Sequence, residues 1–210
     1  MSNSIDDLST AFARLPGIGP RQAKRFVYYL LATPAAERAK LAELIKELGN
    51  NVRQCSECLR YFNGTRAEIC NYCSDVSRES AQLMIVEKDQ DLAAVERAGS
   101  YRGRYFVLGG VLTLTGKGAI REKELLKIVE KRLKNGLKEI VLALSATSEG
   151  EHTADRVREL LAPYRPPERS GRAGDRLKLS TLGRGLATGS ELEYSDAETL
   201  REALANRKDA

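Results

Sequence analysis

Four cysteines are the residues of this 210-residue chain whose spacing most directly indicates chemistry. They form two Cys-x-x-Cys pairs, Cys55 with Cys58 and Cys70 with Cys73, with eleven residues between the pairs. Four thiolates on two such pairs complete the tetrahedral shell that zinc prefers and leave no coordination position open for a substrate. The alternatives are free thiols or a redox pair, but a cysteine cluster in a reducing compartment more often binds metal. We therefore expect one structural Zn²⁺ per chain.

A second chemically informative stretch is the glycine-rich turn at residues 15–19, LPGIG, which separates two helical patterns. Pro20 suits the first turn of the following helix, where backbone N–H groups and the helix dipole favour an anion. Three cations follow on that helix, and such a helix-hairpin-helix can contact phosphates without reading bases. The residues expected to face DNA are Gly17, Gly19, Arg21, Lys24 and Arg25. The alternative is a plain turn whose glycines only permit tight helix packing.

Acidic residues lie near the ends of two expected strands in the second half of the chain. Glu87 ends the run 82–87, and Glu149 and Glu151 follow the run 139–144. Parallel sheets place their functional residues at the carboxyl ends of strands. A Mg²⁺ site would need several carboxylates there. Dipole compensation in a first helical turn explains Glu149 and Glu151 equally well.

Apolar periodicity predicts the elements that must position these residues. Expected helices cover 5–14, 20–32, 34–48, 89–98, 121–135, 151–161 and a last segment to about 206, and expected strands cover 82–87, 104–108, 139–144 and 176–180. Gly49 should end the third helix, whose stripe of Leu41, Leu44, Ile45 and Leu48 we expect to be buried. Ser195 should begin a capping box for the last helix. Residues 162–175 form a Pro-, Gly- and Arg-rich loop.

The alternation of strands and helices after residue 82 predicts a parallel sheet covered by helices. We expect four segments: a helical domain at 1–53, a zinc module at 54–78, an α/β domain at 79–175 and a C-terminal tail at 176–210.

Composition limits the classes of partner. The chain has 34 Lys and Arg against 29 Asp and Glu, a formal net charge of +5, which favours a polyanionic partner. No apolar run reaches membrane-spanning length, and the first residues lack the basic and apolar parts of a signal peptide. We expect a cytoplasmic protein with no membrane partner.

Five stretches in this order give the chain a resemblance to the RecR family, bacterial mediators of recombinational DNA repair. They are LPGIGPRQAKR, CSEC…CNYC, LMIVEKDQDLAAVERAGSYRGRYFVLGG, SEGEHTA and GRGLATGSELEYSDAETLREAL. The resemblance covers nearly the full length. It implies an α+β multi-domain fold: a helix-hairpin-helix, a small four-cysteine zinc module, a Toprim-like α/β domain with a parallel sheet, and a tail that completes the sheet and makes subunit contacts.

The resemblance also implies a non-catalytic function. Family members bind single-stranded, gapped and duplex DNA and, with RecO and RecF, help to load RecA onto strands coated by single-strand-binding protein. It implies a homo-oligomer, a dimer or a tetrameric ring, with Glu87, Glu149 and Glu151 on the surface associated with RecO. Ser145 and Thr147 stand where catalytic Toprim enzymes carry an Asp-x-Asp pair.

Two other functions are compatible with the residues. One is a Mg²⁺-dependent Toprim nuclease or primase-like enzyme that uses Glu87, Glu149 and Glu151. The other is a zinc-ribbon adaptor for RNA or protein.

Overall fold

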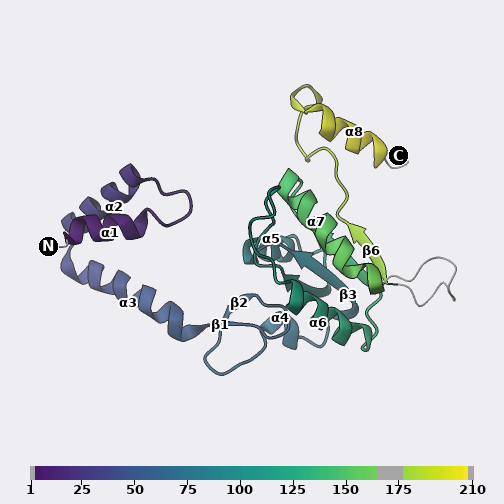
Figure 1. Ribbon diagram of the computed structural model, residues 1–210, viewed down its shortest axis with the longest axis horizontal. Helices are drawn as coiled ribbons and strands as arrows, with labels where there is room; N and C mark the ends of the chain where they lie inside the picture. The colour runs from purple at the N-terminus through teal and green to yellow at the C-terminus, as the bar shows by residue number, and fades with distance from the viewer. Residues whose placement is uncertain (1–2, 165–176, 208–210) are drawn as a thin grey trace. The chain divides into compact units, whose positions relative to one another are not determined.

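The computed structural model describes residues 3–164 and 177–207 (Figure 1). Most of the loop expected at 162–175 lies outside these residues. Internal contacts divide the chain into two compact units, residues 1–53 with 63–65 and residues 54–62 with 66–210. The four-segment division remains a prediction.

The first unit is helical. It contains α1 (Ser4–Phe12), α2 (Pro20–Ala32) and α3 (Ala35–Asn51). Asn3 caps α1 by accepting a hydrogen bond from the Ile5 N–H. The ring of Phe12 packs edge-on against that of Phe26 with centroids 6.1 Å apart, and Ala23 and Val27 are buried. The turn after α1 therefore brings α2 back against it, as the hairpin pattern predicts.

Helix α3 differs from expectation, because its apolar stripe is exposed. Leu41, Leu44, Ile45 and Leu48 all face solvent in this single chain. Part of the stripe borders an apolar groove of about 380 Å³ whose other walls come from α1 and α2. The expectation of a buried stripe was wrong, because α1 and α2 leave a groove beside α3 rather than packing over its apolar face.

Two helix ends also differ from expectation. Helix α3 continues past Gly49 to Asn51. Helix α8 (Ala197–Ala205) is capped by Asp196, whose carboxylate accepts hydrogen bonds from the Glu198 and Thr199 N–H groups. Asp196 directly precedes the first residue of α8, so its carboxylate, rather than the Ser195 hydroxyl, reaches these amides.

The second unit is built on a parallel sheet with strand order β4-β3-β5-β6. Its strands are β3 (Glu79–Val86), β4 (Gly103–Val107), β5 (Glu139–Ala143) and β6 (Lys178–Thr181). The connecting helices are α5 (Asp89–Ala98), α6 (Glu122–Leu133) and α7 (Ser148–Leu161). Strand β6, from the C-terminal tail, pairs in parallel with β5 at the edge, with Ile140 opposite Leu179. The expected mixed α/β architecture is confirmed.

Alternate residues of β3 face two different layers, because successive side chains of a strand point to opposite sides. Leu83 and Ile85 pack with residues of α6 and α7. Met84 and Val86 pack with Leu92 of α5 and with three of the cysteines. Figure 1 shows α6 and α7 on one side of the sheet and α5 on the other. The cysteine segment thus shares a core with one face of the sheet.

Short elements complete the described chain. They are β1 (Val52–Gln54), β2 (Tyr61–Asn63), α4 (Asn71–Ser74) and the 3₁₀ turns Ala162–Tyr164 and Leu192–Tyr194. None of the helices in the described ranges has the length and apolarity needed to cross a lipid bilayer.

Candidate metal centre and nucleic-acid interface

The four cysteines converge on one point. Their sulfur atoms all lie within 4.8 Å of one another, and the Sγ atoms of Cys58 and Cys70 are 3.6 Å apart. A tetrahedron of sulfurs about 2.3 Å from a zinc ion has edges of about 3.8 Å. All four are free thiols, and three are buried. The donor set therefore fits a four-coordinate metal ion.

Local backbone geometry presents the sulfurs. In the first pair, the Leu59 N–H donates to the Cys55 carbonyl (3.0 Å), and Leu59 adopts a left-handed φ of 59°. In the second pair, Cys70 precedes α4, and the Cys73 N–H donates to the Cys70 carbonyl (3.0 Å). Each Cys-x-x-Cys segment is thus a tight turn that aims two sulfurs in one direction.

Hydrogen bonding within the cluster favours the thiolate at Cys55 and the protonated thiol at Cys58 and Cys73. A hydrogen bond from the Cys58 thiol lowers the pKa of Cys55 well below the usual value for cysteine. The Cys70 N–H also points at the Cys55 sulfur, 3.3 Å away. Because the thiolate is the metal-binding form, a bound cation would meet a thiolate at Cys55 and would displace the protons that Cys58 and Cys73 hold.

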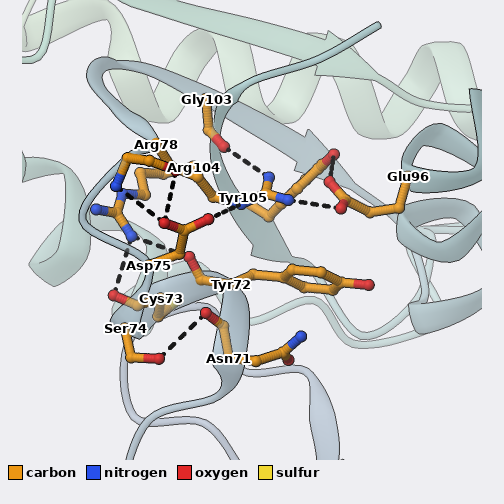
Figure 2. Close-up of polar contacts among 11 residues, drawn as sticks. Asn71, Tyr72, Cys73, Ser74, Asp75, Arg78, Glu96, Gly103, Arg104 and Tyr105 are labelled. Atoms are coloured by element: carbon orange, nitrogen blue, oxygen red, sulfur yellow. Dashed lines mark hydrogen bonds and ion pairs between the residues drawn. The ribbon is translucent and has the colours of Figure 1, made fainter. Parts of the chain in front are cut away.

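Two arginines attach the cysteine turns to the sheet from opposite ends of β4. Arg104 donates from one guanidinium nitrogen to the carbonyls of Tyr72 and Cys73, both at 2.9 Å (Figure 2). Arg121, just before α6, donates in the same way to the carbonyls of Leu59 and Val107, both at 2.9 Å. Between them, the Val107 N–H donates to the Cys58 carbonyl (2.8 Å). The sheet thereby fixes the end of each Cys-x-x-Cys segment.

A polar cluster beside the second cysteine pair adds to this attachment. The Arg78 guanidinium donates to Glu96 and to the Gly103 carbonyl, and it lies 4.7 Å from the centre of the Tyr72 ring. The Tyr105 hydroxyl donates to the other oxygen of Glu96. Figure 2 shows Arg78 between Glu96 and Gly103, with Tyr72 below them. Charge and aromatic contacts therefore join α5, β4 and α4.

Sequence reasoning missed these arginines. Arg104 stands at the start of the apolar run RYFVL, and a charged residue entering a buried strand is a signal for a specific partner. Arg121 gives no comparable signal, because its acceptor Leu59 lies 62 residues earlier in the chain.

The hairpin residues predicted to face DNA lie at the turn and on the first half of α2. Gly17 has a left-handed φ of 77°, and Gly19 is the N-cap of α2. Gly19 offers no side chain to cap the helix, so the N–H groups of Arg21 and Gln22 are available to a ligand. Arg21, Lys24 and Arg25 are exposed, and Lys24 lies 4.0 Å from Asp6. The arrangement can hold an anion at the start of α2.

The acidic residues differ in environment. Glu87 is only 4 % exposed, and its carboxylate accepts a hydrogen bond from the Ser145 N–H at 2.6 Å. This bond joins the carboxyl ends of β3 and β5, where the chain order of the sheet reverses. Thr147 caps α7 by accepting from the Gly150 N–H (3.1 Å). The hydrogen bond between Ser145 and Glu87 therefore lies at the position where α/β sheets usually bind ligands.

Glu149 and Glu151 lie in the first turn of α7 and are partly exposed. Glu151 forms an ion pair with Arg184, which follows β6. Among the described residues, the Glu149 carboxylate has no hydrogen-bonding or ionic partner. The two acids thus remain accessible beside the buried Glu87.

Comparison with known families divides the chain in the same order. Residues 5–48 match the family model described as "RecR, helix-hairpin-helix", residues 81–167 match "Toprim domain", and residues 185–208 match "RecR, C-terminal".

Similar curated proteins extend over almost the whole chain. A protein of Cereibacter sphaeroides named "Recombination protein RecR" is 37 % identical over 204 residues, covering 97 % of this chain and 96 % of that protein. Proteins of the same name from Dehalococcoides mccartyi (34 % over 208 residues, 99 % and 95 % covered) and Bifidobacterium longum subsp. infantis (37 % over 210 residues, 99 % and 96 %) agree. The hairpin, the parallel sheet and the C-terminal segment follow one another in the order of the three family models, and the chain belongs to the RecR family of recombination and repair proteins.

Proposed function

We propose that this protein is a non-catalytic, DNA-binding recombination mediator that binds DNA without regard to sequence. The observation that supports this proposal is the start of α2, which no side chain caps. The backbone N–H groups of Arg21 and Gln22 are free to bind a ligand there, and the side chains of Arg21 and Arg25 lie on the same part of the helix. Helix N-termini and basic side chains bind phosphates, and such contacts carry no base information.

The test is a salt titration of DNA binding. The variant Arg21→Ala/Arg25→Ala removes two exposed cations from α2, and Lys40→Ala/Lys46→Ala removes two from α3 as a matched control. Each lost phosphate contact with single-stranded DNA reduces the slope of log affinity against log salt by about 0.7, so we expect a loss of about 1.4 for the α2 variant only. Equal slopes for wild type and the α2 variant would contradict the proposal.

The bound metal is proposed to be one structural Zn²⁺, held by Cys55, Cys58, Cys70 and Cys73. When bound, zinc would stabilise the turn-rich segment, which has little core of its own. Metal analysis of purified protein should give one zinc per chain, and Cys58→Ala should abolish it.

The non-catalytic character is supported by the Glu87 carboxylate, which is engaged by the Ser145 N–H, and by Thr147, which caps α7. Neither strand end then offers the paired acids that a Mg²⁺-dependent reaction needs. Labelled DNA incubated with the protein and Mg²⁺ should keep its length; nicking or extension that Glu87→Gln removes would establish the enzyme instead.

RecO and RecF, and indirectly RecA and single-strand-binding protein, are the proposed partners. Glu149 and Glu151 are the accessible acids for RecO, with Glu87 supporting the loop beside them. Glu149→Lys should weaken RecO binding in calorimetry by about tenfold, since a like charge at an interface opposes association. Glu124→Lys, on the exposed part of α6, serves as the control.

A homo-oligomer, dimeric or ring-shaped, is proposed from the uncovered stripe of α3. Exposed leucines and isoleucine on one helix face are typical of a subunit contact. Leu44→Glu/Leu48→Glu should reduce the mass measured by sedimentation, and an unchanged mass would exclude this face as the contact.

A further inference from the structure

Helix α2 carries a feature that phosphate contact does not explain. Tyr28 and Tyr29 are adjacent aromatic residues, and their exposed fractions are 56 % and 69 %. Tyrosine bodies are apolar, and two neighbouring rings in solvent are unusual on a helix whose other face already packs against α1.

Helical periodicity places these rings beside the cations. With 3.6 residues per turn, Arg21, Arg25 and Tyr28 fall within an arc of about 60°, and Tyr29 lies next to Arg25 on the same side. The buried residues Ala23 and Val27 fall on the opposite side. The exposed face of α2 is therefore a strip of cations followed by two aromatic rings.

The charge of this strip selects the kind of partner. Helix α2 contains no Asp or Glu. Arg25 and Tyr28 are separated by about 4.5 Å along the helix axis, and the amides at the helix start lie about two turns before the rings. A strand whose phosphates lie on the amides and cations would bring its bases over the tyrosines.

We propose that Tyr28 and Tyr29 stack on the unpaired bases of single-stranded DNA, so that this helix distinguishes single strands from duplex. Every base has an aromatic face, so stacking is sequence-tolerant, and duplex DNA keeps those faces covered by neighbouring base pairs. This inference rests on the proposed function, because the phosphates must first be held by the hairpin.

The experiment compares affinities for a single-stranded oligothymidine and a duplex of equal length at one salt concentration, by fluorescence anisotropy. Each of Tyr28→Ala and Tyr29→Ala should weaken single-strand binding by about tenfold and duplex binding by less than about twofold. Tyr28→Phe and Tyr29→Phe should keep wild-type affinity, because the ring remains. Tyr194→Ala removes an exposed tyrosine from the second unit and is the matched control.

A spectroscopic measurement separates stacking from a folding defect. A strand containing 2-aminopurine should lose fluorescence when it binds the wild type, and it should lose less with Tyr28→Ala/Tyr29→Ala at saturating protein. The tyrosine-to-alanine substitutions should also leave the salt dependence of DNA binding unchanged, because they remove no charge.

Three results would overturn the inference. They are equal losses on single strand and duplex, wild-type affinity in the double alanine variant, and a lower sedimentation mass of that variant without DNA, which would assign the rings to a contact between two copies. If Arg21→Ala/Arg25→Ala still weakens binding in these cases, only the stacking fails. If the arginine variant also binds normally, the proposed function fails as well.

Discussion

Close packing at the end of β5 constrains single residues there. An added Cβ on Gly150 would lie 2.0 Å from the Ser145 carbonyl oxygen, which is backbone and cannot move aside easily. The neighbouring Thr153 is fully buried, and its hydroxyl donates to the Glu149 carbonyl and accepts from the Leu112 N–H. The start of α7 is therefore fixed from both sides, and with it the positions of the exposed acids.

Gly150→Ala should lower the free energy of unfolding by about 2 kcal/mol, because the methyl group forces α7 away from β5. Urea denaturation followed by circular dichroism measures this change. Gly183→Ala, where an added methyl group meets open space, is the control and should have an effect below about 0.5 kcal/mol. Equal stability of both variants would contradict the close approach.

Glu96 should make stability depend on pH. Burial alone would raise the pKa of Glu96, but hydrogen bonds from Arg78 and Tyr105 lower it below its usual value of 4.5. A lowered folded-state pKa gives stability that is present above pH 4.5 and is lost as pH falls through the folded value.

Glu96→Gln should therefore be less stable than wild type by about 2 kcal/mol at pH 7, and the difference should shrink below about pH 4.5. The free energies of unfolding of the two proteins are compared at each pH. Protonation of the other groups, including the cysteines, then affects both proteins equally and cancels in the difference. A difference that stays constant down to pH 3 would show that Glu96 does not carry the ionic contact.

At the scale of elements, β4 connects the two cysteine pairs. Arg104, near the start of β4, donates to two carbonyls of the second turn, and Arg121 joins the Leu59 carbonyl of the first turn to the Val107 carbonyl at the end of β4. Glu57, inside the first turn, is also paired with Lys131 and Arg132 of α6. The relative position of the two turns, and hence the spacing of the sulfurs, depends on the sheet.

Arg104→Ala and Arg121→Ala should each accelerate metal release to a chromogenic chelator by about tenfold or more, since groups that orient metal ligands contribute that much to affinity. Arg102→Ala and Lys123→Ala, which change exposed neighbours, should release metal at the wild-type rate. With Co²⁺ in place of zinc, the thiolate-to-metal absorption band should shift in Arg104→Ala and Arg121→Ala. It should stay at the wild-type position in the two control variants. If all four variants release the metal at the same rate, Arg104 and Arg121 contribute to the stability of the fold but do not orient the metal ligands.

At the scale of the whole molecule, the cysteine cluster and the sheet share a core, whereas α1 and α2 pack on each other through Phe12 and Phe26. Cys55, Cys58 and Cys70 pack in one cluster with Met84 and Tyr105. Metal binding should therefore stabilise the sheet as well as the cysteine segment.

Removing the metal with a chelator should speed amide hydrogen exchange in β3 and β4 and leave α1 and α2 unchanged. The measurement is hydrogen exchange with mass spectrometry, and added Zn²⁺ should restore protection. Faster exchange confined to residues 55–73 would show instead that the segment folds separately from the sheet.

The sequence by itself determined the features that depend on local spacing. Two Cys-x-x-Cys pairs predict a set of four sulfurs that could hold a metal ion, and glycines before a basic helix predict a turn with uncapped amides, because both patterns need only neighbouring residues. Apolar periodicity located the long helices and the four sheet strands. It missed β1 and β2, because three-residue strands are too short to show a period.

Only the tertiary structure decided which distant residues meet. Glu87 and Ser145 are 58 residues apart, and their bond follows from the pairing of β3 with β5, which no local pattern encodes. The same holds for Arg121 with Leu59, and for the stripe of α3, whose exposure depends on what α1 and α2 can cover. Burial is a property of the assembled fold, so the fold alone separates an internal carboxylate from an accessible one.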